Sequence, residues 1–366
     1  MGLRIGILGL PNVGKSSLLN ALTETRAEAS NYPFTTTDRN VGVAAAPDAR
    51  LDMLARKLNP REAIPATVEF VDIAGLIKGA SRGEGLGNRF LAHVREVDAL
   101  VHVVRCFEND SVVHVHGRLD PLEDLEVVET ELLLADLERV ERQREKIIKA
   151  SKARPGGAGP LLEQVDRMAA ALKGGEPARR WPPGLRIGLD TEEELGELQL
   201  LTAKPVVVVA NVWEGNLDGE PWVSRLRERL GPEEEVIPVP VKLEAEMSEL
   251  PPEERAAFAE ELEAGERGLE RLVRIGARLL NLITFYTIAH DKLQAWHVPA
   301  GTRAVDAAGR IHTDMARGFI RMEVMGYEDL MEAGSRAELQ HRGGVRAEGK
   351  DYVVKDGDVC QVLFKV

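Results

Sequence analysis

An eight-residue segment near the N-terminus has the composition of a phosphate-binding loop. Residues 9–16 read Gly-Leu-Pro-Asn-Val-Gly-Lys-Ser, which satisfies the pattern G-x-x-x-x-G-K-[ST] between an apolar run and a helical pattern. In such a loop backbone N–H groups surround the phosphates, Lys15 meets the β- and γ-phosphates, and Ser16 ligates Mg²⁺. The alternative is a Gly-rich turn before an ordinary helix. We predict triphosphate contacts from Gly9, Asn12, Val13, Gly14, Lys15, Ser16 and Ser17.

Two further segments supply chemistry that a triphosphate-hydrolysing site needs. An Asp-Ile-Ala-Gly sequence ends an apolar run, and we predict that Asp72 holds Mg²⁺ through water while the Gly75 N–H reaches the γ-phosphate. The polar stretch at 31–37 is expected to offer a hydroxyl to Mg²⁺ from Thr36, or alternatively from Thr35. Without the other two segments these threonines would be ordinary turn residues. The predicted metal ligands are therefore Ser16, Thr36 and Asp72.

The sequence Asn-Val-Trp-Glu at 211–214 stands where related P-loop proteins read the base. Its position fits the guanine-reading pattern N-K-x-D, but Val212 replaces the lysine and Glu214 replaces the aspartate. In guanine readers that aspartate accepts hydrogen bonds from N1–H and the amino group of guanine, and adenine lacks both donors. Displacing the carboxylate by the extra methylene of glutamate therefore weakens binding of guanine but not of adenine. We predict base contacts from Asn211, Val212 and Glu214, with ATP preferred and GTP as the alternative.

Short β-branched runs alternate with helical stretches and indicate the elements that position these segments. Near-continuous apolar runs that alternate with helices are typical of strands covered on both faces, so we predict a doubly wound α/β domain with a mostly parallel sheet. The runs are Arg4–Leu8, Thr67–Asp72, Ala99–Arg105, Pro205–Ala210 and Val236–Val241.

A long helical pattern interrupts this alternation. Asp120 suits an N-cap and Pro121 the first helical position, and apolar residues recur at heptad-like spacing on both sides of a Pro-Gly-Gly break at 155–157. We predict an antiparallel helical hairpin and interpret its exit at 173–184 as a linker. Residues 139–154 hold seven basic residues against two acidic ones, which favours RNA contacts, with a solvated charged face as the alternative. The apolar positions are Leu133, Leu137, Val140, Ile147, Leu161, Val165, Met168 and Leu172.

Composition changes again after an amphipathic helical pattern at 269–282, where short strands and Gly-rich turns continue to the C-terminus. This indicates a small α+β domain. We therefore divide the chain into a nucleotide domain at 1–120 and 200–281, an inserted helical domain at 121–199, and a C-terminal domain at 282–366.

Overall composition limits the classes of partner. The net charge of −13 does not favour DNA or an anionic membrane, so any polyanion would have to meet a local basic patch. No leader pattern and no apolar run of about 18 residues is present, so we expect a cytoplasmic protein.

Several single residues have a structural interpretation that competes with a functional one. We interpret His102 as a hydrogen-bonded core histidine rather than a catalyst, and Cys106 and Cys360 as buried apolar residues. The aromatic residues Tyr286, Trp296 and Phe319 fit the core of a β-rich domain better than an RNA-stacking surface.

These motifs together resemble the Obg-like branch of the TRAFAC class of P-loop proteins, and in particular the YchF family of ribosome-associated ATPases. The resemblance covers essentially the whole chain and is carried by residues 9–16, 31–36, 72–80, 106–110 and 309–314. It implies a nucleotide domain, an inserted helical hairpin and a C-terminal TGS domain of β-grasp fold. It also implies ATP as the nucleotide, and the ribosome or ribosomal RNA as a partner of the helical and TGS domains.

The resemblance further implies how hydrolysis is catalysed. Apolar Leu76 follows Gly75 where many small GTPases carry a water-positioning glutamine, and the family points to His114 instead, although an exposed loop histidine is the alternative. Lys15 and Gly75 complete the expected catalytic set. Asn12 is placed as in potassium-stimulated relatives, so K⁺ is a possible second cation beside Mg²⁺.

One departure from the family concerns Pro240 and Val241, which stand where many relatives carry a small Ser/Cys-Ala pair. The contribution of this loop to base contacts is left open by the sequence.

Three function classes remain in competition. An ATP-driven or GTP-driven switch acting on a ribonucleoprotein is the first, with a GTP-specific enzyme as its variant. A P-loop metabolic kinase would need an arginine-bearing lid and an acceptor pocket, and neither is evident. A binding module with a purely structural nucleotide is disfavoured by Asp72 and Thr36.

Overall fold

The computed structural model describes residues 3–24, 40–73, 85–109, 117–153, 159–186, 198–251, 253–254, 257, 267–289 and 291–365, the side chains of 85–88, 152, 153 and 186 excepted. The chain divides into two compact units, Met1–Glu24 with Thr37–Gly42 and Phe70–Ala264, and Thr25–Thr36 with Val43–Glu69 and Gly265–Val366. Each unit is described by itself.

The first unit is built on a six-stranded sheet with the order β2-β4-β1-β5-β6-β7. Part of β2 and part of β4 belong to the chain segment 43–69, which is assigned to the second unit. The pairs β1–β5, β5–β6 and β6–β7 are parallel, which confirms the predicted arrangement for those strands. The strands are β1 (Arg4–Leu8), β2 (Val41–Ala45), β4 (Thr67–Asp72), β5 (Ala99–Arg105), β6 (Val206–Asn211) and β7 (Glu235–Val239).

Helices cover this sheet so completely that all seven residues of β5 are buried. One core joins Val104, Val208 and Val236 of three neighbouring strands to Leu125 of α4 and Leu226 of α7. The predicted doubly wound α/β fold is thereby confirmed, because the sheet is parallel at its centre and its strand β5 is covered on both faces. The helices of this unit, apart from those of the insertion, are α1 (Lys15–Glu24), α3 (Gly85–Arg95), α7 (Trp222–Leu230) and α8 (Val241–Ser248).

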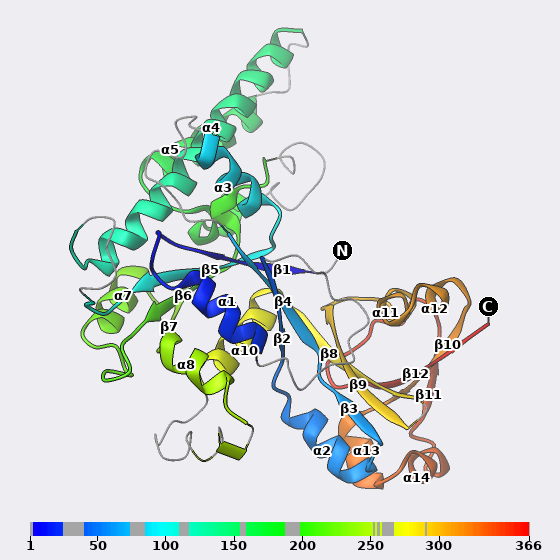
Figure 1. The fold of residues 1–366 in the computed structure, drawn as a ribbon. Coiled ribbons are helices and arrows are strands. Elements are labelled where there is room, and N and C mark those ends of the chain that lie inside the picture. Colours follow the sequence, from blue (N-terminus) through cyan, green and yellow to red (C-terminus); the bar gives the residue numbers. More distant parts are fainter. Residues whose placement is uncertain are drawn as a thin grey trace. The chain divides into compact units, whose positions relative to one another are not determined.

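The predicted helical hairpin is present as α4 (Pro121–Ala153) and α5 (Gly159–Lys173), which lie side by side in Figure 1. Asp120 caps α4 as expected, because its Oδ1 accepts a hydrogen bond of 3.1 Å from the Glu123 N–H. All eight apolar positions expected between the two helices contribute to one core, six of them buried and Leu137 and Leu161 partly so.

The segment after α5, interpreted from its Pro and Gly content as a linker, is packed against the hairpin. Ala178 and Trp181 are buried in the core of the hairpin, and the Trp181 indole N–H donates to the Glu176 carbonyl at 3.1 Å. The Pro and Gly content carried no information about this packing, because the apolar partners are supplied by α4 and by Leu198 and Leu200. Three short helices lie here: η2 (Ala178–Arg180), α6 (Pro183–Arg186) and η4 (Leu201–Ala203).

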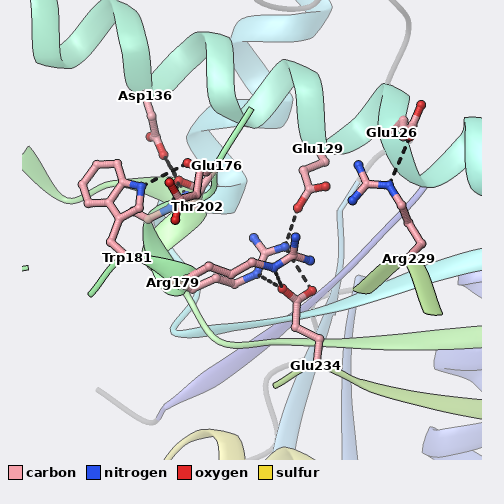
Figure 2. A network of polar contacts seen from close by, with 11 residues as sticks. Glu126, Glu129, Asp136, Glu176, Arg179, Trp181, Thr202, Arg229 and Glu234 are labelled. Carbon is pink, nitrogen blue, oxygen red and sulfur yellow. Dashed lines mark hydrogen bonds and ion pairs between the residues drawn. The ribbon is translucent and has the colours of Figure 1, made fainter. Parts of the chain in front are cut away.

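Polar contacts also fasten α4 to the sheet (Figure 2). The Arg179 guanidinium lies between Glu129 of α4, at 2.6 Å, and Glu234 immediately before β7, at 3.0 Å. Burial alone would raise the pKa of Glu234, but the guanidinium groups of Arg179 and Arg180 hold it below the ordinary value. Farther along α4, the Asp136 carboxylate accepts from the Thr202 N–H at 2.8 Å and from its hydroxyl at 2.7 Å.

The second unit contains a sheet with the order β11-β10-β12-β8-β9-β3, and β10 pairs antiparallel with β12. Tyr286 and Phe319 are buried, and the partly buried Trp296 donates to Thr287 Oγ1 at 2.9 Å, so the predicted core role of these aromatic residues is confirmed. The elements are α2 (Ala49–Leu58), β3 (Glu62–Ile64), α10 (Gly268–Leu279), β8 (Leu282–Ala289), β9 (Lys292–Pro299), α11 (Ala304–Ile311), α12 (Thr313–Arg317), β10 (Phe319–Met325), α13 (Tyr327–Ala333), α14 (Arg336–His341), β11 (Arg346–Glu348) and β12 (Val359–Phe364).

The two compact units do not follow the three predicted domain ranges. Residues 43–69 group with the C-terminal segment, because Leu51 and Leu54 of α2 share a core with Tyr286 and β3 pairs with β9. The three-domain division stays a prediction.

His102 on β5 is buried at 5% exposure, and both cysteines are buried as predicted. The hydrogen bond expected for this histidine is absent at Nε2, which has no partner in the described part of the chain. Burial, with added repulsion from Arg179 and Lys15, lowers the His102 pKa to about 3. The imidazole is therefore neutral in the folded protein at neutral pH.

We expect this histidine to weaken the fold at acid pH. Between about pH 6.5 and 3 the His102 imidazole is protonated in the unfolded chain but stays neutral in the folded chain. The free energy of unfolding therefore falls as pH falls, by about 1.4 kcal/mol per pH unit. Urea unfolding at pH 7 and pH 5 should show this contribution in the parent and not in His102→Gln. Equal pH dependence in the two proteins would contradict the assignment.

Candidate nucleotide-binding site

The loop between β1 and α1 has the backbone conformation that its glycines permit. Gly9 has φ of +149° and Gly14 has φ of +102°, values that residues with a side chain rarely adopt. A Cβ at Gly9 would lie 2.4 Å from the Val103 carbonyl oxygen, and a Cβ at Gly14 would lie 2.4 Å from Nδ2 of Asn211. The loop can therefore pack this closely against β5 and β6 only because it lacks these two side chains.

Lys15 begins α1, and its ammonium turns back over the loop. Its Nζ donates to the Leu10 carbonyl at 2.8 Å, and the side chain is 8% exposed. Burial lowers the pKa of Lys15, while the charge of Asp72 opposes that shift. A phosphate group in the loop would supply the negative charge that this buried ammonium needs.

Ser16 and Asp72 lie together at the end of β4. The Ser16 hydroxyl donates to Oδ2 of Asp72 at 2.7 Å, although the two residues are 56 positions apart in the chain. The second carboxylate oxygen, Oδ1, is buried and has no hydrogen-bond partner among the described residues. A hydroxyl beside a carboxylate with one unsatisfied oxygen fits Mg²⁺, which takes oxygen ligands and retains several waters. These two residues would hold the ion, which would neutralise charge on the phosphates.

Asn211 at the end of β6 ties the phosphate-binding loop to a second loop. Its Nδ2 donates to the Val13 carbonyl at 2.9 Å, and its Oδ1 accepts from the Val241 N–H at 3.3 Å. One amide hydrogen and one oxygen lone pair are thus used, and one of each is left for a base. The departure at Pro240 and Val241 preserves this contact, because the donor is a backbone N–H.

A cavity of about 960 Å³ joins the phosphate-binding loop to the predicted base-reading segment. Its volume lies at the upper end of the range for ligand pockets. The lining residues are Asn12, Gly14, Lys15, Ser16, Ser17, Phe107, Glu108, Asn109, Asn211, Val212, Trp213, Glu214, Val241, Lys242, Leu243, Ala245, Glu246 and Glu249.

The structure brings together most of the residues that the sequence singled out. Eight of the predicted nucleotide contacts line this cavity. The other two, Gly9 and Val13, belong to the loop but not to the lining: Gly9 packs against the Val103 carbonyl, and the Val13 carbonyl accepts from Asn211. Four of the predicted residues lie outside the described residues: the metal ligand Thr36, its alternative Thr35, and the catalytic residues Gly75 and His114. Their roles stay predictions.

Part of the lining was not anticipated. One face of α8 and its C-cap lines the cavity with Lys242, Ala245, Glu246 and the cap residue Glu249, and their spacing of three and four residues is the available sequence signal. Lys242 forms ion pairs with Glu214 at 3.5 Å and with Glu246 at 3.7 Å, so the predicted base-reading carboxylate already has a partner.

Comparison with known proteins agrees with this architecture. A family profile described as "50S ribosome-binding GTPase" matches residues 4–150, and the profile of the YchF C-terminal domain, described as "Protein of unknown function (DUF933)", matches residues 282–365. The chain is 45% identical over 367 residues to the ribosome-binding ATPase YchF of Escherichia coli O157:H7 and 46% identical over 369 residues to that of Haemophilus influenzae, with full coverage of both partners.

A solved structure gives the same result for the fold. The YchF GTPase of Schizosaccharomyces pombe superimposes with a TM-score of 0.83 at 33% identity, covering 99% of this chain and 97% of that one. The predicted family is therefore confirmed: the chain belongs to the YchF family of P-loop nucleoside triphosphatases.

Proposed function

We propose that this protein binds and hydrolyses ATP with Mg²⁺ and uses the reaction as a conformational switch on the ribosome. One observation carries the proposal: a single cavity is lined by Lys15, by Ser16, whose hydroxyl donates to Asp72, and by the base-reading segment at 211–214. The relatives named above are ribosome-binding ATPases by name, which supports the ribosome as partner and the cytoplasm as location. No helix in the described residues is long and apolar enough to cross a membrane.

Release of inorganic phosphate tests the reaction class. We expect the purified full chain to release phosphate from ATP with Mg²⁺ and without any acceptor. Phosphate release that requires an added acceptor, with the phosphoryl group recovered on it, would favour a P-loop kinase instead. Tight binding without turnover would favour a binding module.

Adenine is the base that this site should prefer. Glu214 replaces the aspartate that guanine readers use, and its carboxylate is engaged by Lys242 at 3.5 Å. We expect calorimetry in matched Mg²⁺ to give roughly tenfold tighter binding of ATP than of GTP. Replacing Val212 by Lys and Glu214 by Asp together should move the preference toward GTP. Tighter binding of GTP by the parent would overturn the adenine assignment.

We also propose that His114 positions the attacking water and that K⁺, held with the help of Asn12, assists hydrolysis. Asn12 lines the cavity and has a positive φ of +64°, which places it at the turn of the phosphate-binding loop. Parent-like hydrolysis by His114→Ala would exclude the first proposal, and undiminished hydrolysis with Na⁺ in place of K⁺ would exclude the second.

The hairpin of α4 and α5 is the proposed ribosome contact, alongside the C-terminal TGS domain. Its basic residues lie in exposed pairs with acidic neighbours, such as Arg142 with Glu138 and Lys149 with Glu145. Exposed pairs of this kind contribute only about 0–1 kcal/mol, so phosphate groups can compete for the cations.

Charge reversal tests this contact. Changing Arg142, Lys146 and Lys149 to Glu should weaken ribosome co-sedimentation, and the loss should grow as the salt concentration falls, because fewer phosphates are neutralised. The matched control changes three exposed arginines of α7, namely Arg225, Arg227 and Arg229, to Glu. Equal co-sedimentation of parent and hairpin variant across the salt series would exclude the hairpin.

A further inference from the structure

Trp213 is a large apolar side chain that lies exposed at the nucleotide cavity. It lines the cavity and is 58% exposed, whereas its neighbours Asn211 and Val212 are 5% and 3% exposed. The chain therefore buries two residues at the end of β6 and turns the third outward at the cavity. Neither the phosphate chemistry nor the metal site uses this side chain.

A tight turn fixes the position of the indole ring. The Asn216 N–H donates to the Trp213 carbonyl at 2.9 Å, and the Gly219 N–H donates to the Asn216 carbonyl at 3.1 Å. The ring rests on Gly215 so closely that a Cβ there would lie 2.5–2.8 Å from three ring carbons. Part of the indole is thus supported by backbone, while the residue as a whole is 58% exposed and belongs to the cavity lining.

An exposed, supported indole beside a nucleotide cavity suits a flat heterocycle. Stacking on an aromatic ring depends on the π-face that every base possesses, and it does not require particular hydrogen-bonding groups. Tryptophan also contributes this contact area with only two side-chain torsions to fix on binding. The chemistry therefore matches a purine base held by its face, while the groups on the base edge are read elsewhere.

We propose that Trp213 binds the purine base of the nucleotide through its indole face and thereby positions the triphosphate, without discriminating adenine from guanine. This inference rests on the proposed function, because it assigns a binding residue of the same site. The edge of the base is left to the predicted base-reading residues Asn211 and Glu214, so affinity and base preference reside in different side chains.

Gly215 has a matching role as the support of the ring. Its φ is not in the left-handed region, so alanine suits its backbone, and the three atoms nearest to the added methyl group all belong to the Trp213 ring. Gly215→Ala should therefore displace the indole and weaken purine binding. In the Trp213→Ala background the same change should have no further effect, because the ring is absent.

Calorimetry on the full chain with four probes tests the proposal: ATP, GTP, purine riboside triphosphate, which lacks exocyclic base groups, and tripolyphosphate, all with Mg²⁺. Trp213→Ala should weaken binding of the three nucleotides by a similar factor of roughly 5- to 150-fold and leave tripolyphosphate unchanged. Trp213→Phe should retain most of the affinity. Leu217→Ala, at an exposed apolar residue of the same loop outside the cavity lining, is the matched control.

The possible outcomes separate this inference from the proposed function. If the parent binds none of the nucleotides, the proposed function fails. If the parent protein binds the nucleotides and Trp213→Ala binds them equally well, only the role of Trp213 fails. In that case, loss of ribosome co-sedimentation in Trp213→Ala would assign the indole to a macromolecular partner instead. If Trp213→Ala lost affinity for tripolyphosphate as strongly as for the nucleotides, the phosphate site would be damaged and the stacking role refuted. Additive losses of nucleotide affinity from Trp213→Ala and Gly215→Ala would refute the role of Gly215 as support of the ring.

Discussion

Lys15→Ala should weaken triphosphate binding by roughly 30-fold to several thousand-fold, which corresponds to about 2–5 kcal/mol for removing one partner of a buried charge pair. The ammonium is 8% exposed and already turned over the phosphate-binding loop through its bond to the Leu10 carbonyl. No second described lysine or arginine lines the cavity near the loop, since Lys242 lies on α8 in ion pairs with Glu214 and Glu246. Calorimetry with ATP measures the loss.

A matched control for this substitution lies in the second unit. Lys292→Ala removes an exposed lysine that pairs with Glu62 at 2.6 Å, and its ATP affinity should equal that of the parent. Unfolding curves should show that Lys15→Ala remains folded, since burial lowers the pKa of this lysine and its removal relieves a desolvated charge. Parent-like ATP affinity in Lys15→Ala would refute the phosphate-binding assignment.

Asp72→Asn should abolish most of the Mg²⁺ dependence of ATP binding and slow hydrolysis by roughly 100- to 1,000-fold. The amide keeps the size of the side chain and can still bond to the Ser16 hydroxyl. It removes the negative charge and the unpartnered Oδ1 that fit the ion and its waters. Affinity for ATP should therefore respond weakly to added Mg²⁺, whereas in the parent it should rise.

The binding measurement matters as much as the rate for this residue. Asp98→Asn is the control, because Asp98 is an exposed aspartate that accepts from the Arg4 N–H at 2.8 Å and does not line the cavity. Hydrolysis that falls while the Mg²⁺ response stays intact would place Asp72 outside metal binding. An unchanged rate would remove it from the mechanism.

The sequence alone determined the features that depend on neighbouring residues. The strands β1, β4 and β5 have the predicted bounds, because each is a short run rich in β-branched and apolar residues. The phosphate-binding loop was also predictable, since its glycines and the start of α1 lie within one continuous segment. The hairpin core followed from a heptad-like spacing along α4 and α5.

The tertiary structure decided the contacts between residues far apart in the chain. The Asn211 amide binds the Val13 carbonyl across 198 positions, Glu214 meets Lys242, and β3 joins the sheet of the second unit through β9. Hydrophobic periodicity reports that a residue is buried and says nothing about its partner, and the spacing of polar side chains does not identify a partner on another element. The support of the Trp213 ring by Gly215 is a local contact, but it too was decided by the structure, because it depends on a turn whose geometry exists only in the folded chain.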